Sequence, residues 1–191
     1  MTATETRPRK RSRAVPAVAL AGAVGLAGCQ DDRVETAVFP TEARCVAEAQ
    51  AGQTWYSETD CTEAAEEARA EHERTAPRYA EEALCEEQHG GDCYAEARPG
   101  GGSVFLPLVA GYMLGNMMAG RAAQPLYRTP GGGFANAAGT ARFGSNLGAA
   151  RVSPAGFRAA PDTARAAPMT RATVARTGGL GAGRTGGGFG G

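Results

Sequence analysis

Several kinds of chemistry lack the residues that they need in this sequence of 191 residues. No two of its cysteines are separated by only two residues, which argues against a thiol–disulfide exchange enzyme and against a zinc knuckle. The two histidines, His72 and His89, stand singly on polar stretches, where a histidine is more often a solvated surface residue than a ligand or base. No nucleophile–base pair or phosphate-binding glycine motif is recognisable. We therefore predict a protein that is not an enzyme and that holds no metal or other cofactor.

Bulky apolar side chains are scarce near the C-terminus, and charge is unevenly divided. Residues 31–98 contain 18 acids and six arginines, whereas residues 121–191 contain nine arginines and one acid, Asp162. Because residues 129–191 cannot bury enough apolar surface to offset their ordering entropy, we expect a disordered tail rich in glycine, alanine and arginine. Its arginines suit a solvated linker or an anionic envelope surface, and export argues against a nucleic-acid partner.

The N-terminus has the layout of an export signal. Its first 13 residues contain five basic side chains and one acid, and the next 15 are uncharged. That run is shorter than the roughly 20 residues that span a bilayer. It ends in Leu26, Ala27, Gly28 and Cys29, which resembles a bacterial lipobox. We predict that residues 1–28 are a signal peptide and that Cys29 carries lipid, including palmitate. An ordinary secretory signal, or a short anchor with an incidental cysteine, is the alternative.

The predicted lipid would attach the protein to a bilayer, facing the periplasm, and residues 29–38 would form a linker. Gln30 follows the lipidated cysteine. In enteric bacteria an aspartate at that place tends to retain lipoproteins at the inner membrane. Its absence here favours the outer membrane over the inner membrane.

Four cysteines remain in the predicted mature chain: Cys45, Cys61, Cys85 and Cys93. An even number in an exported chain predicts disulfides, but four cysteines allow three pairings and sequence alone does not choose among them. A weak internal repeat places an aromatic residue six positions before a cysteine, at Phe39 and again at Tyr79, and a second cysteine follows each copy. The repeat favours the pairs Cys45–Cys61 and Cys85–Cys93.

Residues 39–98 are expected to form an acidic helical module. Alanine, glutamate and arginine favour a helix that ends at Arg74. Thr59 or Asp60 would cap it, with Glu63 completing a capping box. Two shorter helices are expected, over 41–50 and 80–88. The fold class predicted is therefore a small, α-rich, disulfide-stapled module.

The uncharged residues 101–120 are the most apolar part of the predicted mature chain, within a region from 99 to 128. Gly111, Gly115 and Ala119 recur every four residues, as in a glycine zipper on one helix face. A helix over 106–119 would be about 21 Å long, short of the roughly 30 Å hydrocarbon core. Three roles stay open: contact with the membrane, packing in a homo-oligomer or against an envelope protein, or the core of the module.

Certain stretches resemble a known family: residues 73–79 (ERTAPRY), Cys85 with Cys93, residues 105–115 (FLPLVAGYMLG) and residues 124–127 (QPLY). They are similar to the YgiB family, catalogued as domain of unknown function 1190, roughly from residue 29 to residue 154. The resemblance implies an envelope lipoprotein of Gram-negative bacteria. Genes of the family often lie beside an ATP-grasp enzyme similar to glutathionylspermidine synthase. No catalytic residues are implied.

Two functions follow as hypotheses. The first is a non-enzymatic structural or interaction factor of the cell envelope. The second is a binding module for a cationic small ligand such as a polyamine, working with the ATP-grasp enzyme. The excess of acids in residues 31–98 motivates the second, because clustered carboxylates attract polycations in a salt-dependent way.

Overall fold

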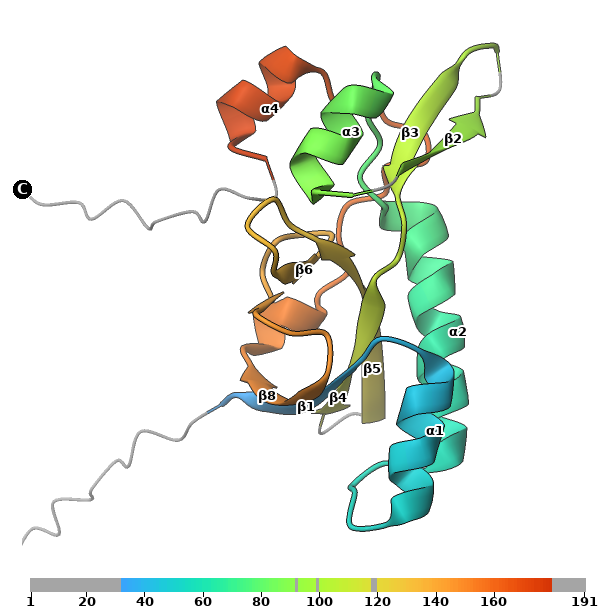
Figure 1. The fold of residues 1–191 in the computed structure, drawn as a ribbon, viewed down its shortest axis with the longest axis vertical. Helices are drawn as coiled ribbons and strands as arrows, with labels where there is room; N and C mark the ends of the chain where they lie inside the picture. The colour runs from blue at the N-terminus through green and yellow to red at the C-terminus, as the bar shows by residue number, and fades with distance from the viewer. Residues whose placement is uncertain (1–31, 92, 99, 118–119, 180–191) are drawn as a thin grey trace, which may run out of the picture. The chain divides into compact units, whose positions relative to one another are not determined.

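A curled antiparallel sheet of six strands forms the centre of the structure, in the order β7-β6-β5-β4-β1-β8 (Figure 1). The computed structural model describes residues 32–91, 93–98, 100–117 and 120–179. The strands of the sheet are β1 (Val34–Phe39), β4 (Gly111–Met117), β5 (Gly120–Arg128), β6 (Phe134–Asn136), β7 (Arg142–Phe143) and β8 (Gly148–Val152). A separate hairpin contains β2 (Cys93–Ala97) and β3 (Ser103–Pro107).

The helices lie on the faces of this sheet or near the hairpin. They are α1 (Glu42–Ala51), α2 (Glu58–Thr75), α3 (Glu82–His89), the 3-10 helix η1 (Pro154–Phe157) and α4 (Arg171–Thr177). The first three lie where the sequence predicts helices. The cap of α2 differs from the prediction, because Ser57 accepts from the backbone N–H of Asp60, and the Asp60 carboxylate accepts from the N–H of Ser57 at 2.7 Å. The capping box therefore begins two residues earlier than Thr59.

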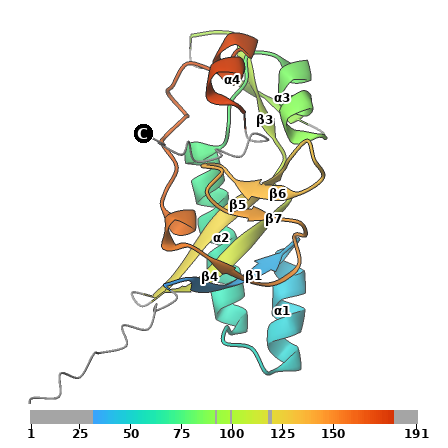
Figure 2. The ribbon, with the colours of Figure 1, turned by 90° about the vertical axis from the view of Figure 1, so that its left-hand side faces the viewer.

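Both faces of the sheet are buried, each by a different part of the chain. Helix α2 lies along β4 and β5 on one face, with α1 beside it (Figure 2). The core on that side contains Phe39, Cys45, Cys61, Ala65, Tyr112 and Leu114. The other face is covered by the C-terminal segment, residues 129–179, which includes η1. The core there contains Val38, Met113, Leu126, Phe134, Val152 and Phe157.

The predicted α-rich fold is wrong, because the described chain is about one-third helix and 30% strand. Within the apolar stretch over 101–120, the described residues 101–117 form β3 and β4 instead of a helix. Five successive residues of β4, from Gly111 to Gly115, are buried. A strand that is covered on both faces reads as a continuous apolar run, and periodicity alone does not distinguish such a run from a buried helix. Among the described residues, no helix is long and apolar enough to cross a membrane.

The predicted glycine zipper is also wrong, since Gly111 and Gly115 lie in β4 and Ala119 lies outside the described residues. Their small size serves the sheet. A Cβ on Gly111 would lie 2.5 Å from the carbonyl oxygen of Phe39, and Gly111 has a φ of +142°. A Cβ on Gly115 would collide with the buried ring of Phe157. Gly111 admits the backbone at the end of the adjacent strand β1, and Gly115 admits a ring from the layer that covers the sheet, without any second helix.

The long disordered tail predicted over 129–191 is corrected for residues 129–179, and residues 180–191 lie outside the described residues. Residues 129–179 contain β6, β7, β8, η1 and α4. Asn136 is fully buried, and its side chain binds the backbone of Gly156, Thr140 and Ala141. The segment needs few bulky residues because it packs on an apolar sheet face that the rest of the chain supplies.

Both disulfides pair as the internal repeat favours. Cys45–Cys61 joins α1 to α2, with a Cα–Cα distance of 5.7 Å. Cys85–Cys93 joins α3 to the start of β2, at 6.3 Å. In the chain-entropy model, a disulfide that closes a loop of about 15 residues stabilises a fold by roughly 3 kcal/mol. Cys85–Cys93 closes a shorter loop and should contribute somewhat less.

Candidate functional site

The chain's two histidines lie in one cluster with three tyrosines. On α2, His72 Nδ1 is 2.9 Å from the hydroxyl of Tyr127, and Nε2 is 2.8 Å from that of Tyr94. At the end of α3, His89 Nε2 is 2.9 Å from the hydroxyl of Tyr79. The His89 ring also lies edge-on to Tyr127, 6.0 Å between centres. Because His89 is buried and His72 half-buried, the expectation that both are solvated surface residues is wrong.

The hydrogen bonds of His89 determine its protonation state. Nδ1 lies 3.0 Å from the carbonyl oxygen of Arg128, which only accepts, so Nδ1 carries the proton. Nε2 then accepts from the hydroxyl of Tyr79. Burial lowers the pKa of His89 to about 4, because an imidazolium here would lose its hydration. Both ring nitrogens are therefore occupied in a neutral ring, and neither is left to act as a base.

Arg78 is a second buried polar centre, 5% exposed. Its guanidinium donates to the carbonyl of Glu73 at 2.8 Å and to the hydroxyl of Thr163 at 2.7 Å. A longer bond of 3.4 Å reaches the carbonyl of Ala76. The carboxylate of Glu96, 3.3 Å from Nε, balances the charge. Arg78 therefore joins the end of α2, strand β2 and the C-terminal segment.

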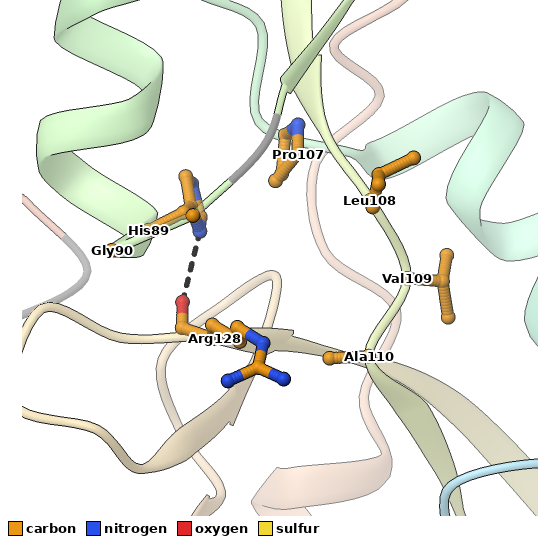
Figure 3. A pocket seen from close by; sticks show the side chains of 8 residues that line it. His89, Gly90, Pro107, Leu108, Val109, Ala110 and Arg128 are labelled. Carbon is orange, nitrogen blue, oxygen red and sulfur yellow. Dashed lines mark hydrogen bonds between the residues drawn. The ribbon is translucent and has the colours of Figure 1, made fainter.

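A cavity of about 360 Å³ adjoins the histidine cluster (Figure 3). One wall contains His89, Gly90 and the side chain of Arg128, and the opposite wall is the connection from Pro107 to Ala110 between β3 and β4. Within that connection Leu108 is 53% and Val109 42% exposed. Cavities of roughly 300–1,000 Å³ are the size at which proteins hold small ligands or partner side chains. A neutral histidine, one arginine and apolar groups suit binding of a neutral or anionic group.

The sequence model of one family, described as "Protein of unknown function (DUF1190)", matches residues 33–190. The chain belongs to the DUF1190 family. The match begins one residue before β1 and includes residues 129–179, so all six strands of the sheet lie within the family domain. No solved structure matches the chain.

A larger cavity of about 660 Å³ lies elsewhere in this DUF1190 domain. Its walls include Thr75 at the end of α2, Tyr79, the turn around Gly139 and Thr140, and Thr163 of the C-terminal segment. Tyr79 thus contributes to the larger cavity and its partner His89 to the smaller one. The segment that was expected to be disordered supplies part of this wall.

The predicted site residues are distributed as follows. Cys29 lies outside the described residues, so its lipidation stays a prediction. The disulfide cysteines are bonded, and Gly111 and Gly115 are strand residues. The described part of the chain contains no group of three histidine, cysteine or acidic side chains placed to hold a metal ion.

The polyamine hypothesis likewise stays a prediction. Some of the acidic charge that motivated it is paired within the described domain. Glu48 lies 3.0 Å from the guanidinium of Arg44, and Glu42 lies 2.9 Å from that of Arg69. Both are exposed pairs, which salt weakens.

Sequence reasoning missed the histidine–tyrosine cluster, because its members come from four elements and from the connection between α2 and α3. One signal was present. The stretch ERTAPRY, which carried the family resemblance, contains both Arg78 and Tyr79. These two residues are buried polar groups: Arg78 bonds to Thr163, 85 residues further along the chain, and Tyr79 bonds to His89 of the next helix. The motif is thereby explained as a structural junction of the DUF1190 fold.

Acid should destabilise this domain through His89. Its pKa is 6.5 when unfolded and about 4 when folded, so the unfolded chain binds the proton more tightly. The contribution of His89 to the free energy of unfolding is therefore fully present above pH 6.5. It is lost between pH 6.5 and pH 4, by about 3 kcal/mol in all. Urea unfolding of the wild type and of His89→Gln across this range measures the contribution. The variant should be less stable at pH 7.5 and lose less on acidification. Equal slopes would show that His89 titrates normally.

Proposed function

We propose that this DUF1190 protein is an exported, lipid-anchored factor of the cell envelope that acts by binding a partner and not by catalysis. Two disulfides within the folded domain support an oxidising compartment, since such bonds are rare in reducing ones. The lipobox-like sequence that ends at Cys29 supplies the anchor, and the outer membrane is the favoured location.

The exposed pair Leu108 and Val109, beside the cavity at His89 and Arg128, is the single observation that carries the binding role. Two neighbouring large apolar side chains exposed to solvent lose hydration favourably when a partner covers them. Arg128 adds a cation at the same cavity, and arginine is enriched where partners bind most strongly. The neutral, fully hydrogen-bonded His89 favours binding over proton transfer.

Lipidation at Cys29 is tested directly. Wild-type protein from cells should begin at an acylated Cys29 and remain with membranes after a high-salt wash. Cys29→Ser should lack the acyl mass and leave the membrane fraction, because one residue carries the attachment. The matched control is Gln30→Asn, which keeps the cysteine and its polar neighbour. A wild-type protein that still contains residues 1–28, or has an unmodified Cys29, would contradict the proposal.

The binding face is tested by crosslinking in intact cells. Leu108→Asp with Val109→Asp should remove the specific envelope neighbours of the wild type, because charges at this face oppose burial. Ala70→Asp, at an exposed position of α2, is the matched control and should keep them. Equal yields of the same neighbours from both variants would place the binding surface elsewhere.

A further inference from the structure

The lipid-bearing cysteine predicted at position 29 is close in sequence to β1, a strand that is paired with a neighbouring strand on each side. Val34 is five residues after Cys29, so the two Cα atoms are at most about 18 Å apart when the chain is fully extended. The headgroup layer, about 6 Å thick on each side of the hydrocarbon core, uses part of that length. Roughly 12 Å remains between the headgroups and Val34, about the diameter of one helix.

The strand cannot supply extra length by separating from the sheet. In β1, Glu35 pairs with Asn116 of β4 on one side and with Arg151 of β8 on the other. Val34 itself is buried and pairs with Val152. Freeing these residues would break ladder hydrogen bonds on both sides and expose apolar surface. The tether therefore ends at a fixed point of the fold.

One end of the sheet is defined by that point. In the antiparallel sheet, β4 finishes where β1 begins, so Met117 and its partner Gly120 lie at the same end as Val34. The other end of β4, at Gly111, lies about 20 Å away at 3.3 Å per residue. Beyond Gly111 are Leu108 and Val109. Figures 1 and 2 also show α3, α4 and the β2–β3 hairpin at one end of the described domain, away from β1, while α1 occupies the other end.

We propose that the sheet end formed by the start of β1 and the end of β4 lies against the headgroups of the bilayer that holds the Cys29 lipid, with the cavity beside Leu108 directed away from it. This inference rests on the lipid anchor of the proposed function. Its occupant is the lipid surface itself, because the remaining tether, about one helix diameter at full extension, is too short for a folded protein domain to lie between. The fold thereby presents the binding face to the periplasmic space.

Photo-crosslinking to lipid tests this orientation in the full-length lipidated protein. A benzophenone amino acid is placed at Met117 or at the exposed Glu35 near the tether, and at Leu108 at the far end. After irradiation of native envelope vesicles, protein–phospholipid adducts are measured by mass spectrometry. We expect several-fold more adducts from Glu35 and Met117 than from Leu108.

Two near-end positions are used because Met117 is half-buried and its replacement alters packing. Equal adduct yields at the two ends overturn the proposal.

A longer tether provides the second arm. A flexible Gly-Ser linker of about 15 residues, inserted between Gln30 and Asp31, adds roughly 20 Å of mean reach. Adducts at Glu35 should then fall toward the level at Leu108, and unchanged adducts would contradict an orientation imposed by tether length. Mass analysis of Cys29 separates the two proposals. An unacylated cysteine refutes the anchor, whereas an acylated one with equal adducts refutes only the orientation.

Discussion

Replacing Gly111 with alanine should reduce the free energy of unfolding by roughly 3–5 kcal/mol, from the sum of backbone strain and overpacking. The new Cβ would lie 2.5 Å from the carbonyl oxygen of Phe39 and 3.2 Å from Cα of Pro40. Both are backbone atoms, and they belong to the junction between β1 and α1. The φ of +142° adds strain for any residue that has a Cβ. Such a loss is comparable to the whole stability of many domains.

Gly144→Ala is the matched control for Gly111→Ala. Its added Cβ meets no atom within 4 Å, and Gly144 does not have a positive φ, so stability should change by less than about 0.5 kcal/mol. Urea unfolding at pH 7.5, followed by circular dichroism, gives both values. Equal stability of the two variants would contradict the strand assignment of Gly111, since a small residue at that position would be tolerated on a zipper helix.

Replacing Arg78 with methionine should cost about 3 kcal/mol, because it removes all the hydrogen bonds of a buried guanidinium and leaves the carbonyl of Glu73 and the carboxylate of Glu96 without this donor. The carbonyls of Glu73 and Ala76 and the hydroxyl of Thr163 all lose their bonds to the guanidinium. Methionine fills a similar volume, so lost hydrogen bonding accounts for most of the change. Arg78→Lys should be intermediate, since an ammonium keeps the charge but lacks the planar fork that reaches three groups.

Glu96→Gln separates hydrogen bonding from charge at this junction. Glu96 is 41% exposed, so removal of its charge should cost less than about 1 kcal/mol. Urea unfolding of the three variants gives the order. A Glu96→Gln loss as large as that of Arg78→Met would mean that the ion pair, and not the backbone carbonyls, holds the end of α2.

Local sequence signals predicted the first three helices and the disulfide pairs. Alanine, glutamate and arginine with nearby capping residues identified α1, α2 and α3 within a few residues, because helical hydrogen bonds form between near neighbours in the chain. The repeat of an aromatic residue and a cysteine favoured the pairs Cys45–Cys61 and Cys85–Cys93, which both form. The stretches around ERTAPRY also identified the family, whose model matches residues 33–190. The signal peptide and the lipid at Cys29 remain predictions.

The sequence by itself therefore determined the features that depend on near neighbours, together with the family. The tertiary structure alone decided the state of residues 101–117 and 129–179. The apolar run became β4 because layers on both of its faces bury it, with Phe157 over Gly115 on one side. The glycine-rich segment became ordered because it packs on a sheet face made by other residues. The histidine cluster and Arg78 also acquired their partners only by folding. In these regions many of the deciding contacts join parts of the chain that are far apart in sequence, and composition and spacing do not record such contacts.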